Sequence, residues 1–199
     1  MKRFILSMAA LAFMTAPAKA AVETYELDKP HTQILFFVEH MNVSLSSGEF
    51  LDYEGTLNID SENPENSTVD VTIQTASIDM GDEKWDAHMK NEDFFHVEEY
   101  PTMTFKSTDV NVTGEETAEM TGDLTILGVT KPVTLAVEFR NKGTHAYSGR
   151  ELIGFSATGN IKRSEWGMDY GIPNVGDDVE IRIEVEGIKP EAESESSDQ

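Results

Sequence analysis

The sequence predicts an all-β fold that buries its apolar face against itself, as a closed barrel or a sandwich. Apolar and polar residues alternate with period two in segment after segment from Tyr25 to Gly187, which places successive side chains on opposite faces of a sheet. No long helical pattern interrupts this alternation, and most connections are short, which favours neighbouring antiparallel strands. A sheet of this kind covers its apolar face with more sheet.

Eight segments carry the alternation, and clusters such as Ser46-Ser47-Gly48 and Asn141-Lys142-Gly143 are expected as turns between them. The segments are Gln33–Asn42, Glu49–Ile59, Thr68–Thr75, Thr102–Val112, Ala118–Leu127, Pro132–Arg140, Leu152–Arg163 and Val179–Ile188. Eight strands of this length at about 3.3 Å per residue would form a barrel roughly 30 Å long. Such a barrel is either filled by its own side chains or holds one small ligand.

The alternation also predicts which side chains face inward. They are Ile34, Phe36, Val38 and His40; Leu57 and Ile59; Val69, Val71 and Ile73; Met103 and Phe105; Leu124 and Ile126; Val133, Leu135, Val137 and Phe139; Phe155 and Ile161; and Val179, Ile181, Ile183 and Val185. Leu35 and Phe37 make the first strand apolar on both faces. They are expected to pack under an irregular segment or at a subunit contact, which leaves a homodimer open.

Small residues and one arginine share these inward rows. Gly122, Ala157 and Gly159 either leave room or admit a neighbouring backbone, so alternation leaves a cavity and a solid core equally open. Arg163 falls in the row of Phe155 and Ile161, where a charge is costly unless it is paired. It is expected either to pair with a carboxylate, Asp86 or Glu165, or to mark with His40 the end that holds a ligand's polar head.

Two segments break the alternation. Ile78 to Tyr100 is expected to contain one or two short helical segments around residues 83–97, and a connection this long is usually functional. Its bulky side chains would either cap one mouth of the barrel or simply join the core; they are Trp85, Met89, Phe94 and Phe95. Ser164 to Asp177, with Trp166, Met168 and Tyr170, is expected to be a folded-over loop.

Residues 1–20 have the pattern of a secretory signal. Lys2 and Arg3 precede an apolar stretch too short to span a bilayer, and Ala18-Lys19-Ala20 forms a small-residue cleavage site. We expect cleavage after Ala20, one domain over residues 21–189, and a disordered acidic tail over residues 190–199, which cannot bury apolar surface. No later stretch is apolar enough for a membrane helix, so no stable membrane insertion is expected.

The composition narrows the function classes. Cleavage would leave 12 basic residues against 37 acidic ones, a formal charge of −25, and such a surface repels phosphate backbones, which excludes nucleic acid as a partner. There is no cysteine, so disulfides, thiolate metal sites and cysteine nucleophiles are excluded.

No catalytic motif emerges from the sequence. The five histidines form no His-Glu-x-x-His frame, and Asp86-x-His88 alone is a weak metal signal. A Gly-x-Ser-x-Gly elbow, a phosphate-binding glycine loop and a dinucleotide fingerprint are all missing. We therefore expect no enzyme activity, no metal and no cofactor.

Several motifs resemble those of the YceI-like family and occur in the same order along the sequence. They are Asp28-x-x-His31-Thr32-x-Ile34-x-Phe36-x-Val38-x-His40, Trp85-Asp86-x-His88-Met89, Tyr100-Pro101-Thr102-Met103-Thr104-Phe105, Thr121-Gly122-Asp123-Leu124-Thr125-Ile126, Gly154-Phe155-Ser156-Ala157 and Arg163-Ser164-x-Trp166-Gly167-Met168. The sequence departs from the family pattern at two aromatic positions: Trp85 stands where an arginine is usual, and Trp166 where a phenylalanine is usual. The first change removes a contact for an anionic head group.

The resemblance implies an extended, lipocalin-like barrel of eight antiparallel strands, a periplasmic location, and a tunnel that holds a polyisoprenoid or a similar amphiphilic lipid. The residues expected to bind this ligand are Ile34, Phe36, Val38, His40, Phe50, Trp85, Asp86, His88, Met89, Phe94, Met103, Phe105, Leu124, Ile126, Phe139, Phe155, Ile161, Arg163, Trp166 and Met168. Two alternatives stay open: an enzyme that acts on such a lipid at the Asp86/His88 end, and a stress-related structural barrel without a ligand.

Overall fold

The structure is a computed structural model that describes residues 22–191. Its strands are β1 (Glu23–Leu27), β2 (Gln33–His40), β3 (Ser44–Phe50), β4 (Tyr53–Ile59), β5 (Thr68–Gln74), β6 (Ile78–Asp79), β7 (Thr102–Val112), β8 (Thr117–Ile126), β9 (Val129–Thr144), β10 (Glu151–Lys162) and β11 (Val175–Ile188). One α-helix, α1 (Glu83–Met89), and short 3-10 turns complete the described chain. The expected signal and residues 192–199 of the expected tail lie outside the described residues.

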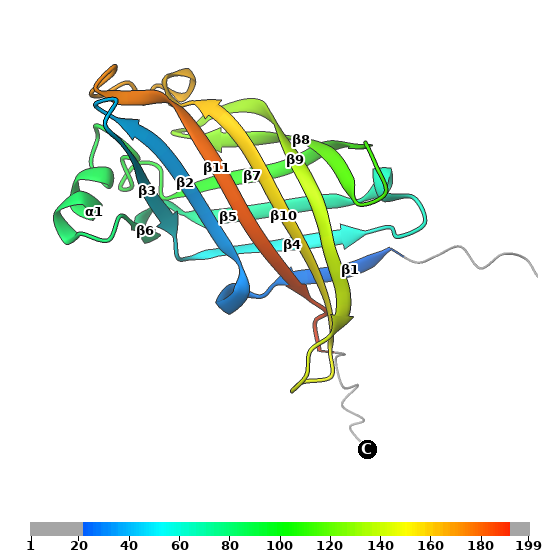
Figure 1. Cartoon of the computed structure of the whole chain (residues 1–199). Helices are drawn as coiled ribbons and strands as arrows, with labels where there is room; N and C mark the ends of the chain where they lie inside the picture. The colour runs from blue at the N-terminus through cyan, green and yellow to red at the C-terminus, as the bar shows by residue number, and fades with distance from the viewer. Residues whose placement is uncertain (1–21, 192–199) are drawn as a thin grey trace, which may run out of the picture.

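The strands form a closed antiparallel barrel of eight (Figure 1). Hydrogen bonding runs in the order β1-β4-β5-β7-β8-β9-β10-β11. The ring closes where β1 returns to β11 through the pairs Glu26–Ile188 and Leu27–Gly187. Beyond this short closure β2, β3 and β6 extend the same sheet, with β2 paired to β11 and β3 paired to both β2 and β6. The barrel prediction is confirmed, and a sandwich is excluded.

A 3-10 turn at Lys29–His31 separates β1 from β2. Both strands pair with β11, so together they occupy one position in the wall of the barrel. The sequence prediction missed β1, because this strand is only five residues long and offers just two apolar side chains, Tyr25 and Leu27. Tyr25 is nevertheless fully buried and joins Leu57 and Ile153 in a small core cluster.

Two expected turns were wrong. Ser46-Ser47-Gly48 lies inside β3, and the chain reverses earlier, at Met41 and Asn42, whose φ angles are +54° and +53°. Gly48 serves packing instead: a Cβ there would lie 2.5 Å from the ring of Phe36, its partner on β2. The segment 141–143 likewise belongs to β9.

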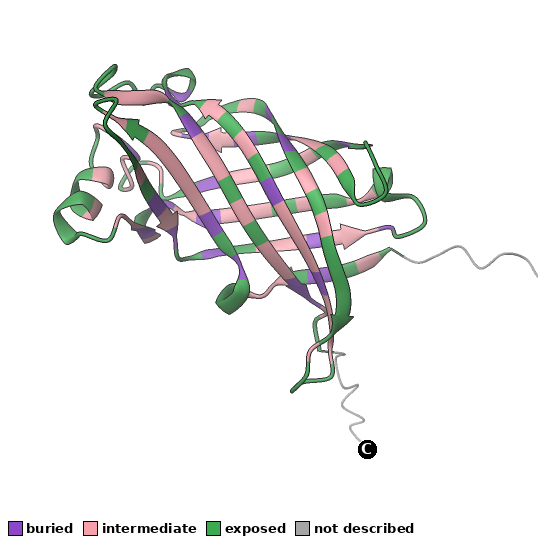
Figure 2. Ribbon diagram, in the orientation of Figure 1, coloured by how far each residue is buried: buried purple, intermediate pink, exposed green. Residues whose placement is uncertain are grey.

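Alternation along the strands appears as alternating burial in Figure 2. The main core cluster collects side chains from β2, β5, β7, β8 and β9, from the segment around α1, and from the 3-10 turn at Arg163–Trp166. The segment after β6 and the loop before β11 therefore cover one end of the barrel, the α1 end (Figure 1). Residues 22–191 contain no helix with the length and apolar character that a membrane crossing requires.

Candidate functional site

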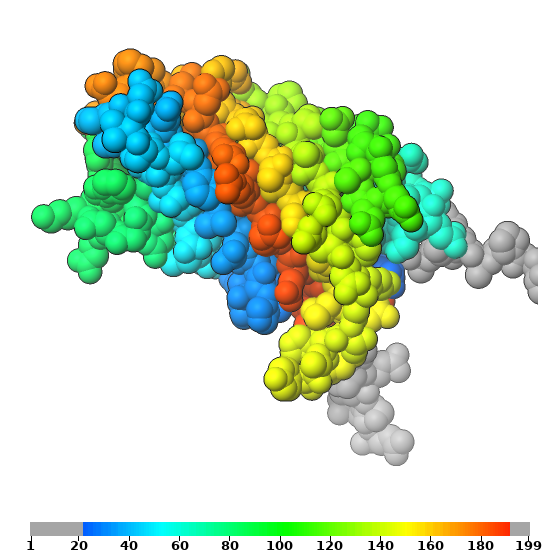
Figure 3. Space-filling model, in the orientation of Figure 1, coloured from blue at the N-terminus to red at the C-terminus, as the bar shows by residue number. Residues whose placement is uncertain are grey.

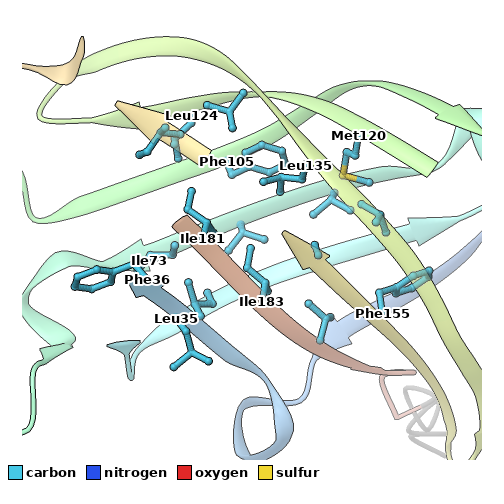
Figure 4. Close-up of a pocket in the computed structure, with 18 of the residues that line it drawn as sticks. Leu35, Phe36, Ile73, Phe105, Met120, Leu124, Leu135, Phe155, Ile181 and Ile183 are labelled. Atoms are coloured by element: carbon cyan, nitrogen blue, oxygen red, sulfur yellow. The ribbon is translucent and has the colours of Figure 1, made fainter. Parts of the chain in front are cut away.

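The barrel encloses a cavity of about 820 Å³ that runs between its two ends. Figure 4 shows its central part, into which side chains from β2, β5, β7, β8, β9, β10 and β11 project. At the α1 end the lining includes Trp85, His88 and Tyr170, and at the opposite end Pro64 and Gly114. The structure therefore contains a cavity where alternation alone had left a solid core equally open.

Most of the residues expected to bind a ligand lie on this cavity. The residues that line it are Ile34, Phe36, Val38, His40, Phe50, Trp85, His88, Met89, Phe94, Met103, Phe105, Leu124, Ile126, Phe139, Phe155, Ile161, Arg163 and Met168. The period-two alternation of the strands accounts for the members of this set that lie on strands. The other members come from the α1 segment and from the turn and loop before β11.

Asp86 and Trp166 do not line the cavity, so the structure does not place these two residues where a ligand would contact them. The Asp86 carboxylate accepts the backbone N–H of Met80 at 2.7 Å and thereby ties α1 to the end of β6. Trp166 is 3% exposed and its Nε1 donates to the carbonyl of Leu124 at 3.2 Å. Both residues support the wall of the cavity from behind.

The binding-residue prediction omitted part of the lining. The additional apolar residues are Leu27, Leu35, Leu57, Ile59, Val69, Val71, Ile73, Met80, Phe95, Val110, Val112, Ala118, Met120, Val133, Leu135, Val137, Ile153, Ala157, Tyr170, Val175, Val179, Ile181, Ile183 and Val185. Alternation does identify Met120, two residues before Gly122 on the inward face of β8. It fails for Val110, because a register shift between Ser107 and Asp109 reverses the inward face of β7.

The lining is apolar in the middle and polar at the ends. The acidic and basic residues on the cavity are Asp60, Glu115, Glu116 and Lys142 at the end away from α1, and Arg163 at the α1 end. Asp60 is engaged locally, since its carboxylate accepts from the backbone N–H groups of Glu62 and Asn63 at 3.1 and 2.9 Å. The arrangement suits a long apolar molecule that ends in a polar group.

Arg163 is buried at the α1 end, and within residues 22–191 its guanidinium forms no ion pair with a carboxylate. Its Nε donates to Gly176 O at 2.7 Å, Nη1 to Met168 O at 2.9 Å, and Nη2 to Tyr170 O and Val175 O at 2.9 Å each. The expected pairing with Asp86 or Glu165 was wrong. Backbone carbonyls satisfy the guanidinium instead, and burial lowers the pKa of Arg163.

These four bonds hold the loop over residues 167–175 across the end of the barrel. Tyr170 of this loop meets the ring of His88 at 5.4 Å and that of Phe94 at 5.5 Å, so the loop and the α1 segment contact each other at the mouth of the cavity. Phe95 packs edge-on against Phe50 at 5.4 Å. The α1 segment therefore caps the cavity and also joins the core.

Small residues in the interior rows do not create the space. A Cβ at Gly122 would lie 2.4 Å from the ring of Phe105, and one at Gly159 would lie 2.6 Å from Cδ2 of Leu135. Large cross-strand neighbours lean over both glycines. Ala157 alone of the three small residues lines the cavity, and it is 8% exposed.

His88 is the titratable side chain that an enzyme at this end would use. Its Nε2 lies 3.3 Å from Oδ2 of Asp93, not beside Asp86, and both side chains are partly exposed. Outside the cavity mouth, Asp28, His31 and Glu186 bring ligand-type atoms within 4.8 Å of one another. His31 Nδ1 lies 2.8 Å from Asp28, whose hydrogen bond raises the pKa of His31.

Comparison with known proteins identifies relatives of this chain. The family model of the YceI-like domain matches residues 25–187. Protein YceI of Escherichia coli O157:H7 is 35% identical over 191 residues, which cover 95% of this chain and 99% of the relative. A UPF0312 protein of Ectopseudomonas mendocina is 37% identical over 173 residues, or 86% of this chain and 90% of the relative.

Solved structures with the same fold include the Campylobacter jejuni YceI protein, with a TM-score of 0.70 and 35% identity over 77% of this chain and 90% of that one. A polyisoprenoid binding domain from Saccharophagus degradans, implicated in plant cell wall breakdown, has a TM-score of 0.63 and covers 85% of this chain and 99% of that one. At 14% identity the second likeness is one of fold.

Proposed function

The chain belongs to the YceI-like family, and on that premise we propose that it is an exported carrier that holds a polyisoprenoid or a similar amphiphilic lipid inside its barrel. The observation that carries the proposal is the cavity of about 820 Å³, whose lining is predominantly apolar. Ligand pockets in proteins typically occupy about 300–1,000 Å³. The polyisoprenoid-binding domain with the same fold supports the choice of ligand class.

The apolar lining is sufficient to bind such a tail. One isoprene unit has five carbons, each of which contributes up to about 0.8 kcal/mol when buried, or about 3–4 kcal/mol per unit. Association costs about 4–15 kcal/mol. Three or four buried units therefore offset this cost without a charged contact, so affinity follows tail length and the polar end sets selectivity.

The polar head is proposed to lie at the α1 end, beside His40, His88 and Arg163, which line the cavity there. Arg163 uses four of its five N–H groups on backbone carbonyls, so one N–H on Nη1 is left to face a ligand oxygen. This leaves room for a neutral or singly hydrogen-bonded head.

The carrier is proposed to work in the periplasm without chemistry of its own. The secretory pattern of residues 1–20 supports export. Against an enzyme, Asp86 is committed to the amide of Met80 and stands outside the cavity. Turnover of a bound polyprenyl compound that His88→Ala abolishes while binding persists would establish the enzyme instead.

The proposal is tested by uptake of a series of polyprenols of increasing length into delipidated protein. Affinity is expected to rise with each added isoprene unit until the cavity is full. Leu124→Glu places a charge on the lining and is expected to abolish uptake, whereas Thr125→Glu, on the adjacent outward position, is expected to retain it. Affinity that is independent of tail length in the folded wild type would refute the proposal.

A further inference from the structure

Exposed apolar side chains gather at the α1 end of the barrel. We define the apolar tip as Met41, Val43, Leu45, Trp85, Tyr170 and Ile172, whose exposed fractions are 60%, 84%, 62%, 50%, 47% and 38%. The hairpin between β2 and β3 lies beside the loop that precedes β11 at this end (Figure 3). Exposed apolar patches of this kind mark a site of interaction.

The members of the apolar tip are connected to one another. The Met41 N–H donates to Asn174 O at 2.6 Å, which joins the β2–β3 hairpin to the loop over residues 167–175. Leu45 and Ile172 border the same shallow depression on the outer wall. On the other side of that loop, Tyr170 contacts His88 of the same helix as Trp85.

The apolar tip is also continuous with the cavity. Trp85 and Tyr170 line the cavity and are about half exposed, so their rings form part of the inner wall and part of the outer surface. An apolar molecule that leaves the cavity at this end would move onto the apolar tip before it meets water.

Charge is depleted from the two loops of the apolar tip, whereas Trp85 lies on α1 between Lys84 and Asp86. Residues 40–46 contain no Asp, Glu, Lys or Arg, and residues 167–175 contain only Asp169, in a chain of which 26% is charged. The depression beside Leu45 and Ile172 is bordered by carboxylates instead: Glu39, Asp177, Asp178 and Glu180. Uncharged apolar and aromatic residues suit the headgroup boundary of a bilayer, and the flanking carboxylates repel anionic lipid.

We propose that the apolar tip docks transiently on the surface of a zwitterionic lipid bilayer, so that a lipid tail passes between bilayer and cavity without crossing water. The proposal rests on the carrier function and adds the surface from which the cargo is taken. Trp and Tyr at the mouth occupy the headgroup level, as such side chains do at membrane interfaces, while Met41 and Val43 reach the acyl boundary.

Flotation of the purified protein with phosphatidylcholine vesicles that contain no polyprenyl lipid tests docking apart from cargo. The wild type is expected to float, and Val43→Asp with Leu45→Asp is expected to lower the partition coefficient about tenfold or more. The matched control is Tyr147→Asp, which changes a side chain that is 97% exposed in the connection between β9 and β10, at the other end of the barrel. This variant is expected to float like the wild type.

Fluorescence adds an independent readout, because the chain has two tryptophans, and Trp166 is buried whereas Trp85 is half exposed. Vesicles are expected to shift the emission to the blue and to protect it from acrylamide. In Trp85→Phe both effects are expected to vanish. Addition of phosphatidylglycerol to the vesicles is expected to weaken binding at low salt.

Three results would overturn the proposal: no flotation of the wild type, equal flotation of the tip variant, or a concentration-dependent dimer that Val43→Asp abolishes, since a second copy would then cover the apolar tip. Failure of the carrier function gives a different pattern. Vesicles would still bind the wild type, but organic extracts of the purified protein would contain no lipid.

Discussion

Arg163 illustrates how much a single buried side chain organises at the cavity mouth. Its four hydrogen bonds join the 3-10 turn at its own position to the loop over residues 167–175 and to the start of β11. Lysine cannot replace it, because an ammonium lacks the planar fork that reaches several carbonyls at once. Arg163 therefore positions the loop that carries Tyr170.

Arg163→Met is expected to lower the free energy of unfolding by about 3–5 kcal/mol, since four carbonyls lose a charged donor. Arg163→Lys is expected to recover only part of this loss. The measurement is urea unfolding at neutral pH. Arg182→Met serves as the control, because that guanidinium lies on the outer surface against Phe37 and Glu180, and its loss is expected to cost less than about 1 kcal/mol. Equal losses for the two variants would contradict this account of Arg163.

Ala157 is a small residue on the cavity wall, so a larger apolar side chain at this position would fill part of the cavity without adding a charge. Ala157→Phe is expected to shorten the longest polyprenol that the protein binds, because the added ring occupies tail volume. Thr158→Phe, one residue along β10 and exposed, is expected to leave the length limit unchanged. Competition binding across the polyprenol series measures the limit. An unchanged limit in folded Ala157→Phe would mean that the tail does not pass this point.

At the scale of elements, the closure of the barrel depends on more than hydrogen bonds between strands. β1 meets β11 through only two residue pairs. Beside this seam Glu23 accepts from Lys142 of β9 and from Lys189, which follows β11, the latter at 2.7 Å. The two ammonium groups lower the pKa of Glu23 to about 2.

The lowered pKa of the Glu23 carboxyl predicts that the free energy of unfolding decreases in acid. Glu23 binds its proton near pH 4.5 when unfolded and near pH 2 when folded, so its contribution is complete above about pH 4.5 and is lost as the pH falls towards 2. Because the side chain keeps 24% of its surface exposed, the expected contribution is about 1–2 kcal/mol.

Glu23→Gln is expected to remove this contribution at neutral pH and to flatten the fall in stability between pH 4.5 and 2. Thermal unfolding of both proteins across this range checks the prediction. Glu180→Gln is a suitable control, because its partner Arg182 lies on the same strand and does not span the seam. A parallel acid dependence of wild type and Glu23→Gln would show that the seam does not rely on this carboxylate.

The elements also show what the sequence could predict and why it fell short. The long strands follow from period two, because each buries one face along its whole length. The short β1 and β6 do not, since two to five residues carry too little alternation and form only as partners of longer strands. The serines within β3 have the composition of a turn. They are tolerated in a strand because β3 lies near the edge of the sheet, not because serine favours strands.

For the site, alternation locates the wall but not the space inside it. The glycines at 122 and 159 suggested room, and large neighbours on adjacent strands occupy it. The bulge in β7 reverses the inward face at Val110, and no local signal in the sequence marks it. The partners of Arg163 are backbone carbonyls from a loop 5 to 13 residues away, which sequence patterns that pair opposite charges cannot anticipate.

At the scale of the whole molecule, the fold separates two tasks. The strands of the barrel provide an apolar interior that no single element could enclose, while the α1 segment and the loop over residues 167–175 cover its mouth with half-exposed aromatic rings. The formal net charge of −22 favours repulsion between copies of the chain. In the proposed carrier, storage of the lipid and access to it are thereby assigned to different parts of the barrel.

The most direct test of the central claim is mass spectrometry of organic extracts of the protein, purified without detergent and then denatured. We expect an amphiphile with a prenyl-type tail in near-stoichiometric amount in the wild type, and its loss from the folded Leu124→Glu variant. Extracts of the wild type that repeatedly contain no such lipid would contradict it.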